Sequence, residues 1–131
     1  MCGARQTVRK TSTFSTTSTS FTDVTDLSIT VTTGPCPVLL ILSSTVNGSN
    51  LNVRTFLTFN VDGSDKGAST GGLVSARLPD GASSDVVTMT YLTDQLSAGS
   101  HTFKVRMRVS TGTGYLIADN DGEIQFTLVE M

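Results

Sequence analysis

The segment 96–114 constrains the fold of this chain more than any other part of its sequence. It opens with a turn-forming stretch, continues as a long run of alternating apolar and polar residues, and ends in a second turn that contains glycine. One face of the run carries His101, Phe103, Val105, Met107 and Val109. The other face carries Thr102, Lys104, Arg106, Arg108 and Ser110. A period of two over this length predicts a strand with one buried and one solvated face, which is typical of antiparallel sheets.

The rest of the chain carries the same signature and predicts an all-β fold of about eight strands. The 131 residues include 22 Thr and 16 Ser, and the β-branch of threonine favours strands over helices. Turn-forming residues separate the runs, as in the Asn-Gly hairpin signal at 47–50. We therefore predict an antiparallel β-sandwich of jelly-roll type. The strands are expected at 21–33, 38–46, 51–61, 73–78, 87–91, 101–110, 115–118 and 124–131.

Residues 1–20 differ from the rest, and we expect an extended N-terminal arm in front of a sandwich domain at 21–131. Val8 and Phe14 stand nearly alone as large apolar residues in this segment, which is rich in Thr and Ser. Ordering the backbone costs about 1–2 kcal/mol per residue, and the arm has little apolar surface to bury in return. It is therefore expected to be disordered or held by another chain.

The run at 38–42 is apolar at every position. A strand that is apolar on both faces is covered on both sides, whereas the outer face of a lone two-sheet sandwich is wet. The run therefore indicates cover from a second subunit. We predict that Val38, Leu40 and Leu42, or alternatively Phe56, lie at a subunit interface.

Composition and charge exclude several classes of partner. The net charge is −2, and we see no basic patch able to neutralise many phosphates, so nucleic acid is not expected. The longest apolar run is far shorter than the roughly 20 residues of a membrane span, so no membrane association is expected. The first twenty residues carry no apolar signal segment, which predicts synthesis in the cytoplasm.

The two cysteines, Cys2 and Cys36, form no C-x-x-C pair, so we expect no zinc site. Cytoplasmic synthesis favours free thiols and leaves a disulfide as the alternative. The Asp-Asn-Asp-Gly segment at 119–122 is similar to part of a calcium loop, but the closing Glu at the required spacing is missing. We expect neither metal nor cofactor.

His101 is the one histidine of the chain. A catalytic histidine needs a nucleophile and an orienting acid, and the sequence has no G-x-S-x-G or comparable signature. The aspartates fall mostly in turns, where backbone requirements explain them. We therefore predict no enzyme activity and a structural or interface role for His101, which at a threefold axis would also sense pH.

The polar face of the strand at 101–110 carries a basic stripe, composed of Lys104, Arg106 and Arg108. One interpretation is a solvated outer face balanced by acidic turns. The other is an electrostatic contact with an acidic neighbouring subunit. The first is the simpler interpretation, and both stay open at this point.

Three segments together resemble small trimeric β-sandwich domains of bacteriophage fibres and other virion proteins. Residues 16–31 resemble the Thr/Ser-rich lead of those domains, which passes into a D-V-x-x-L-S-x-T pattern. Residues 96–105 are similar to their L-x-A-G-x-H-T hairpin, and 126–131 to their closing strand. The resemblance implies a jelly-roll-like homotrimer mounted on a virion, and it implies no catalytic residues.

Because no long fibre shaft precedes the domain, we expect a capsid decoration or cement protein, assembled in the host cytoplasm and located on the virion. Its expected partners are copies of itself and the major capsid protein or other virion proteins, with His101 at the subunit interface. The expected shell contacts are Arg5, Arg9, Lys10 and Phe14 of the arm. The alternative is the receptor- or glycan-binding tip of a short fibre. The absence of Trp disfavours a glycan site.

Overall fold

The computed structural model describes residues 2–49, 52–77, 84–118 and 122–131, and in these ranges every regular element is a β-strand. The all-β prediction is confirmed: each expected strand has a counterpart, and β1, β2 and β6 are additional. The described part of the chain contains no helix that is able to cross a membrane. The strands are β1 (Arg5–Lys10), β2 (Phe14–Thr16), β3 (Thr22–Thr33), β4 (Val38–Gly48), β5 (Arg54–Val61), β6 (Ser64–Asp65), β7 (Val74–Arg77), β8 (Ser84–Leu92), β9 (Gly99–Val109), β10 (Gly114–Ile117) and β11 (Ile124–Glu130).

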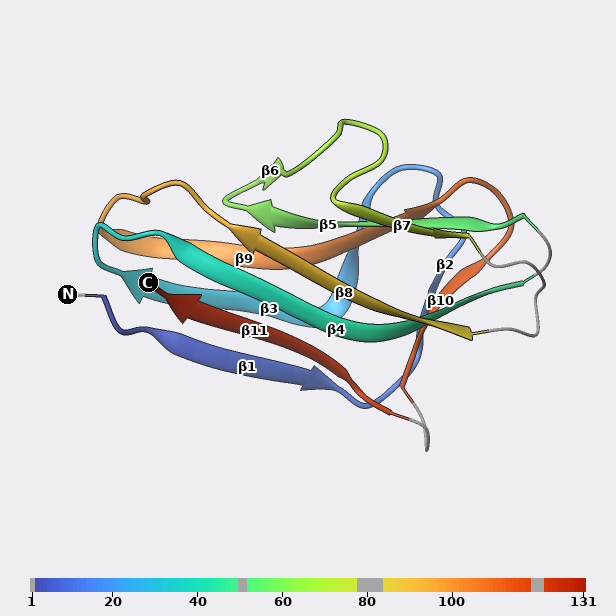
Figure 1. The fold of residues 1–131 in the computed structure, drawn as a ribbon, viewed down its shortest axis with the longest axis horizontal. Helices are drawn as coiled ribbons and strands as arrows, with labels where there is room; N and C mark the ends of the chain where they lie inside the picture. The colour runs from blue at the N-terminus through green and yellow to red at the C-terminus, as the bar shows by residue number, and fades with distance from the viewer. Residues whose placement is uncertain (1, 50–51, 78–83, 119–121) are drawn as a thin grey trace.

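The strands form two antiparallel sheets packed face to face, as Figure 1 shows. Sheet A is built around β4, which pairs with β8 along one side and with β11 and then β10 along the other. β1 extends this sheet beyond β11, and β2 extends it beyond β10. Sheet B has the order β3-β9-β5, with β6 and β7 pairing with the two ends of β5. Both chain termini lie at the same end of the sandwich (Figure 1).

The residues expected to form a separate arm lie in sheet A instead, which corrects that expectation. β1 pairs with β11 from Arg5 to Lys10, and β2 pairs with β10 from Phe14 to Thr16. Backbone hydrogen bonds to these partner strands order the polar segment, so it needs little apolar surface of its own. Segment 5–16 is therefore part of the sandwich domain.

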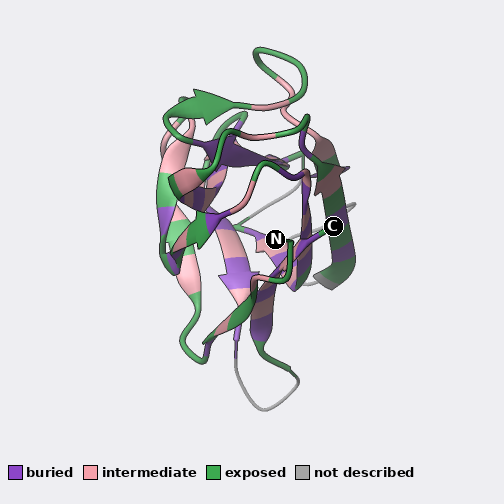
Figure 2. Cartoon of the chain, turned by 90° about the vertical axis from the view of Figure 1, so that its left-hand side faces the viewer, coloured by how far each residue is buried: buried purple, intermediate pink, exposed green. Residues whose placement is uncertain are grey.

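The core lies between the sheets and follows the alternation predicted for the segment 101–110. In β9 the odd-numbered residues from His101 to Val109 are buried, and the even-numbered ones are half-exposed. Figure 2 shows the same banding of buried and more exposed residues along the other strands. Phe59 of sheet B stacks on Phe126 of sheet A, with ring centroids 5.4 Å apart. Burying a side chain of this size contributes about 1.5–3 kcal/mol.

Several strands that follow one another in the chain lie in different sheets. β4 belongs to sheet A and β5 to sheet B, so the Asn-Gly pair near position 48 does not make a hairpin between them. β4 itself continues through Gly48, and residues 50–51 lie outside the described ranges. β8 likewise belongs to sheet A and β9 to sheet B. The hairpin that the resemblance at 96–105 implies is therefore not formed.

The alternation in β4 generates a direct prediction about stability. Leu42 is fully buried, whereas the next residue, Ser43, is exposed on the opposite side of the strand. We expect Leu42→Ala to lower the free energy of unfolding by about 2–5 kcal/mol, because it leaves a cavity in the core. Ser43→Ala is the matched control and should change stability by less than about 0.5 kcal/mol. Urea denaturation measures both, and equal effects would contradict the observed register.

Candidate functional site

The apolar run in β4 faces two directions, and the structure corrects part of the interface prediction. Val38, Leu40 and Leu42 are fully buried in the core of the single chain, so they offer no surface to a neighbouring subunit. Leu39 and Ile41 point outward and are half-buried. The interface candidates in β4 are therefore shifted by one position from the expected ones.

The outer face of sheet A is almost free of charge. Strand register places Val129, Leu39 and Leu92 side by side in one apolar row across β11, β4 and β8. Within the described strands of sheet A, the charged residues in the outward rows are Arg5 and Arg9, both on the edge strand β1. Removing such a face from water avoids most of the penalty that burial of a charge imposes.

Large apolar side chains that stay exposed in the described ranges gather on the same sheet. Val86 and Leu92 of β8 are 72% and 55% exposed, and Met131, directly after β11, is 59% exposed. Exposed apolar side chains that share a face mark an interaction surface better than scattered ones. The alternation at 86–92 in the sequence indicates this exposure, because it places Val86 and Leu92 on the face opposite the buried Met89.

The outer face of sheet B is charged, and most of its charges are paired. Lys104 Nζ lies 3.0 Å from Asp23, while Arg106 contacts Asp23 at 3.0 Å and Asp65 at 2.7 Å. The Lys104 ammonium and the Arg106 guanidinium lower the pKa of the Asp23 carboxyl. Arg106 also donates to the Phe21 carbonyl oxygen at 2.7 Å. Two members of the basic stripe are thus balanced within the chain, which favours the interpretation as a solvated outer face.

Arg108, the third member of the stripe, has a different environment. Its guanidinium lies over the Phe56 ring, 3.9 Å from the centroid, and 5.8 Å from the centroid of Phe21. It donates through Nε to the Thr70 carbonyl and through Nη1 to the Thr19 carbonyl at 3.5 Å. Among the described residues no carboxylate pairs with it. Phe56, the alternative interface residue, is therefore a platform for Arg108 on sheet B.

A pocket of about 420 Å³ lies on this face of sheet B, with residues 19–21 and 65–70 as its walls. Gly72 fixes the second wall close to the sheet. Its φ is +65°, and a Cβ at this position would lie 2.6 Å from the Leu57 carbonyl oxygen and 3.0 Å from the Phe21 ring. Glycine is therefore required there. The lining residues are Thr19, Ser20, Phe21, Asp65, Ser69, Thr70, Arg106 and Arg108.

The four residues expected to contact a shell occupy unlike positions. Arg5 and Arg9 are exposed on the outward side of β1. The Lys10 side chain is buried, and its Nζ lies 3.1 Å from the Asp26 carboxylate at the bulge in β3. Phe14 packs against the core. The structure therefore leaves Arg5 and Arg9 at the surface, where Arg9 Nε lies 3.3 Å from the Glu123 carboxylate, whereas Lys10 and Phe14 pack within the chain.

His101 connects three segments at one end of sheet B. Its Nδ1 lies 2.5 Å from Asp62 Oδ2, and its Nε2 lies 2.7 Å from the Ser97 carbonyl oxygen. Two acceptors favour the doubly protonated ring, so Asp62 and then the Ser97 carbonyl raise the pKa of His101. Burial acts to raise the pKa of Asp62, but His101 and the Thr102 N–H together bring it below its usual range. Both ring nitrogens are occupied within the chain.

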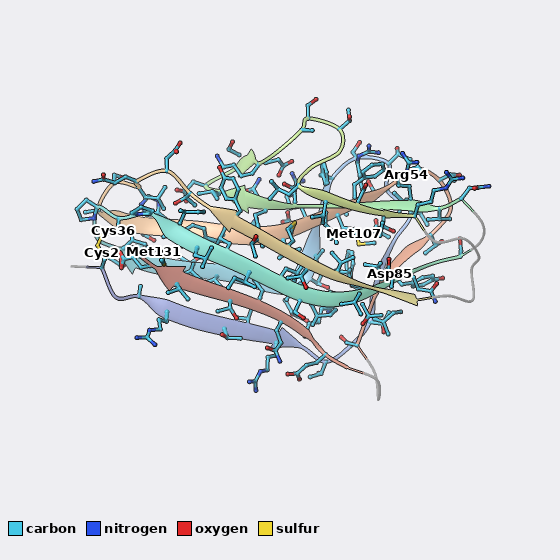
Figure 3. All side chains as sticks on the ribbon, in the orientation of Figure 1. Cys2, Cys36, Arg54, Asp85, Met107 and Met131 are labelled. Carbon is cyan, nitrogen blue, oxygen red and sulfur yellow. A yellow bond between two sulfur atoms is a disulfide. The ribbon has the colours of Figure 1, made fainter. Side chains whose placement is uncertain are left out.

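The two cysteines are joined as a disulfide in this structure, against the expectation of free thiols. Figure 3 shows Cys2 and Cys36 beside Met131 at the end of the sandwich opposite Arg54 and Asp85. The bond links the segment before β1 to the turn between β3 and β4. The disulfide was the alternative in the sequence analysis, and the proximity of the two cysteines depends on the pairing of β1 with β11.

A buried carboxylate stabilises the same end of the sandwich. Glu130 accepts backbone hydrogen bonds from Gly3 at 3.0 Å, Ala4 at 3.1 Å and Gly34 at 2.8 Å. The Ala4 N–H, together with those of Gly3 and Gly34, lowers the pKa of Glu130. The disulfide and this carboxylate thus hold the N-terminal segment and the β3–β4 turn together.

These groups also form a cluster with metal-ligand chemistry. One ligand atom each from Cys2, Cys36 and Glu130 lies within 4.8 Å of the others. The disulfide bonds the two sulfur atoms to each other, so in this state they are not thiolate ligands. The segment 119–122, considered above as a calcium loop, lies outside the described residues as far as position 121.

The sequence matches no family model and no curated protein, but its fold resembles those of solved structures. A chain of infectious bursal disease virus, Gt strain, aligns with a TM-score of 0.56 at 7% identity, over 98% of this chain and 33% of that one. The present chain therefore has a jelly-roll-like β-sandwich fold. The VP2 subviral particle of the same virus gives 0.53 at 8% identity, over 98% and 37%. Eiger TNF from S. frugiperda gives 0.50 at 11%, over 100% and 94%.

The chain spans about a third of the length of the virus chains that it matches. Identities this low establish a shared fold, and function has to be argued from the surfaces of this chain.

The His101–Asp62 contact predicts a pH dependence of stability. The pKa of His101 is raised in the folded state. The stability that this contact contributes is therefore fully present below about pH 6.5 and is lost as the pH rises through the raised pKa. We expect the native chain to lose stability as the pH rises above about 6.5, and Asp62→Asn to flatten this slope. The exposed Asp94→Asn is the matched control. Urea unfolding across this pH range measures the slope, and identical profiles for all three proteins would contradict the assignment.

The disulfide predicts a loss of stability on reduction. Cys2 and Cys36 are 34 residues apart, so their bond restricts the unfolded chain and contributes about 2–4 kcal/mol. Thermal or urea unfolding with and without a thiol reductant measures this loss. A variant with Cys2→Ser and Cys36→Ser should be insensitive to the reductant. Titration of two free thiols in the native, unreduced chain would show the disulfide assignment to be wrong.

Proposed function

We propose that this chain is a structural subunit of a virus particle, in which it associates with copies of itself as a homotrimer and decorates or cements the outer shell. The proposal involves binding and no catalysed reaction. It is supported by the resemblance to trimeric virion domains and by the jelly-roll-like fold shared with chains of a virus capsid. The observation that carries it is the contrast between the two outer faces of the sandwich.

The outer face of sheet A suits an interface in both chemistry and size. The 11 residues of β4, at about 3.3 Å each, and a width of four strands about 4.8 Å apart, from β8 across β4 to the edge strands β1 and β2, give a face of roughly 700 Å². A standard interface buries about 800 Å² per partner. The exposed Val86 and Leu92 supply apolar area at one side of this face.

The lack of charge favours a second copy of the chain as the occupant. Around a threefold axis the same residues of three copies approach one another, so like charges near the axis repel. The outward rows of β4, β8, β10 and β11 avoid this with uncharged side chains, most of which are Thr, Ser or aliphatic residues. The charged outer face of sheet B is less suited to such a contact.

Arg5 and Arg9 remain as the candidates for contact with the shell. They lie on the edge strand β1, beside the uncharged face, and both are exposed. An acidic surface on the major capsid protein would complement them, and three copies of this edge would add their contributions by avidity. The proposed shell contact is therefore the edge strand β1 of sheet A, and not the separate N-terminal arm expected from the sequence.

A charge placed in the uncharged face should prevent the association. Light scattering coupled to gel filtration should give the native protein a mass three times that of the 13.8 kDa chain. Ile41→Asp should give the monomer mass with an unchanged circular dichroism spectrum, because the carboxylate would be buried without a partner. Ser28→Asp, on the outer face of sheet B, is the control and should leave the mass unchanged. A native monomer, or an Ile41→Asp variant that stays associated, would refute the proposal.

A further inference from the structure

We propose that the pocket between residues 19–21 and 65–70 binds an acidic saccharide, with the Arg108 guanidinium as the group that receives its carboxylate. The pocket lies on the outer face of sheet B, on the other side of the sandwich from the association face of sheet A. It therefore stays accessible in the proposed trimer. The proposal goes beyond the assembly role and does not depend on it.

Arg108 is held in place before any ligand arrives. The Phe56 ring supports one face of its guanidinium, and the carbonyl groups of Thr70 and Thr19 accept from Nε and Nη1. Among the described residues, Nη2 has no hydrogen-bond partner. Nη2 therefore remains to donate a charge-assisted hydrogen bond to a carboxylate. Prior orientation of the side chain lowers the entropy cost of binding.

The charge balance of this surface leaves Arg108 uncompensated. The charges of Lys104 and Arg106 are matched by those of Asp23 and Asp65, whereas Arg108 has no carboxylate partner among the described residues. The pocket therefore carries one net positive charge on its floor, which favours an anionic ligand.

Two exposed arginines extend this charge along the sheet. Arg54 lies two residues before Phe56, and register places it opposite Arg77 on β7. Like charges directly opposite each other on neighbouring strands are unfavourable without an anion nearby. Their presence on the same face as Arg108 strengthens the preference for an acidic ligand.

The walls of the pocket indicate a saccharide. Four hydroxyl-bearing residues line it, two from each wall, and they suit the hydroxyl groups of a sugar. Its volume of about 420 Å³ lies within the usual range for small-ligand sites. Phe21 adds one apolar surface on which the carbon face of a sugar ring packs. The hydroxyl-bearing residues are Thr19, Ser20, Ser69 and Thr70.

The experiment compares saccharides that differ in charge. Isothermal titration calorimetry of the full chain would use 3′-sialyllactose and a glucuronate disaccharide as probes, with lactose as the neutral counterpart. At least one acidic saccharide should bind, and lactose should bind at least about tenfold more weakly, since a charged hydrogen bond is lost. Arg108→Gln should weaken binding by about 10- to 100-fold. Arg9→Gln, an exposed arginine on sheet A, is the control and should have no effect.

Because Arg108 also holds the pocket walls, a second variant keeps the test independent of its structural role. Ser69 is exposed and makes no hydrogen bond among those of the described residues, so Ser69→Asp leaves the arginine contacts in place and adds a repelling charge. It should weaken binding of the acidic saccharide by at least about tenfold, because the two carboxylates repel each other.

Four results would overturn the proposal: no binding of either acidic probe, equal binding of lactose, full affinity in Ser69→Asp, or binding of sulfate or a poly-glutamate peptide in place of the saccharides. Light scattering on the same samples reports the trimer separately, so failure of this site is distinguishable from failure of the assembly role.

Discussion

The two sheets pack against each other through the alternate residues of β4 and β9, and this packing determines which side chains the outer faces present. Each strand lies inside its own sheet, so each has neighbours on both sides and a core row on one face. The inward row of β9 and that of β4 are buried almost completely. Once these rows meet, the outward rows are fixed as well, because successive side chains in a strand point to opposite faces. The interface candidates on sheet A and the arginines on sheet B are therefore consequences of core packing.

The two outer faces solve different physical problems. Sheet B balances Lys104 and Arg106 with Asp23 of β3 and Asp65 of β6, and Arg106 also binds the Phe21 carbonyl just before β3. Sheet A presents aliphatic and hydroxyl side chains with charges confined to its edge strand. The outer face of sheet A is therefore suited to burial against copies of the same chain, and the outer face of sheet B is suited to solvent or to a charged ligand. We regard this division as the basis of both proposals.

The sequence predicts the strands well where alternation is unambiguous and less well where it is not. In the segment 101–110 polar and apolar residues alternate strictly, so the buried side of His101 followed directly from the pattern. The run at 38–42 is apolar throughout, so the pattern does not decide which residues face inward, and the predicted interface position of Val38, Leu40 and Leu42 is wrong. β1 and β2 were missed because their order comes from backbone pairing with β11 and β10, about 100 residues away in the chain. The Cys2–Cys36 bond and the three N–H groups on Glu130 depend on the same long-range pairing.

Hydroxyl-radical footprinting at low and high protein concentration shows which face is covered when copies of the chain associate. We expect the outer face of sheet A to lose reactivity as the concentration rises, at Leu39, Ile41, Tyr115 and Val129. Phe21 and Phe56 on sheet B should keep theirs. Reactivity that is independent of concentration, or protection confined to sheet B, would contradict the account.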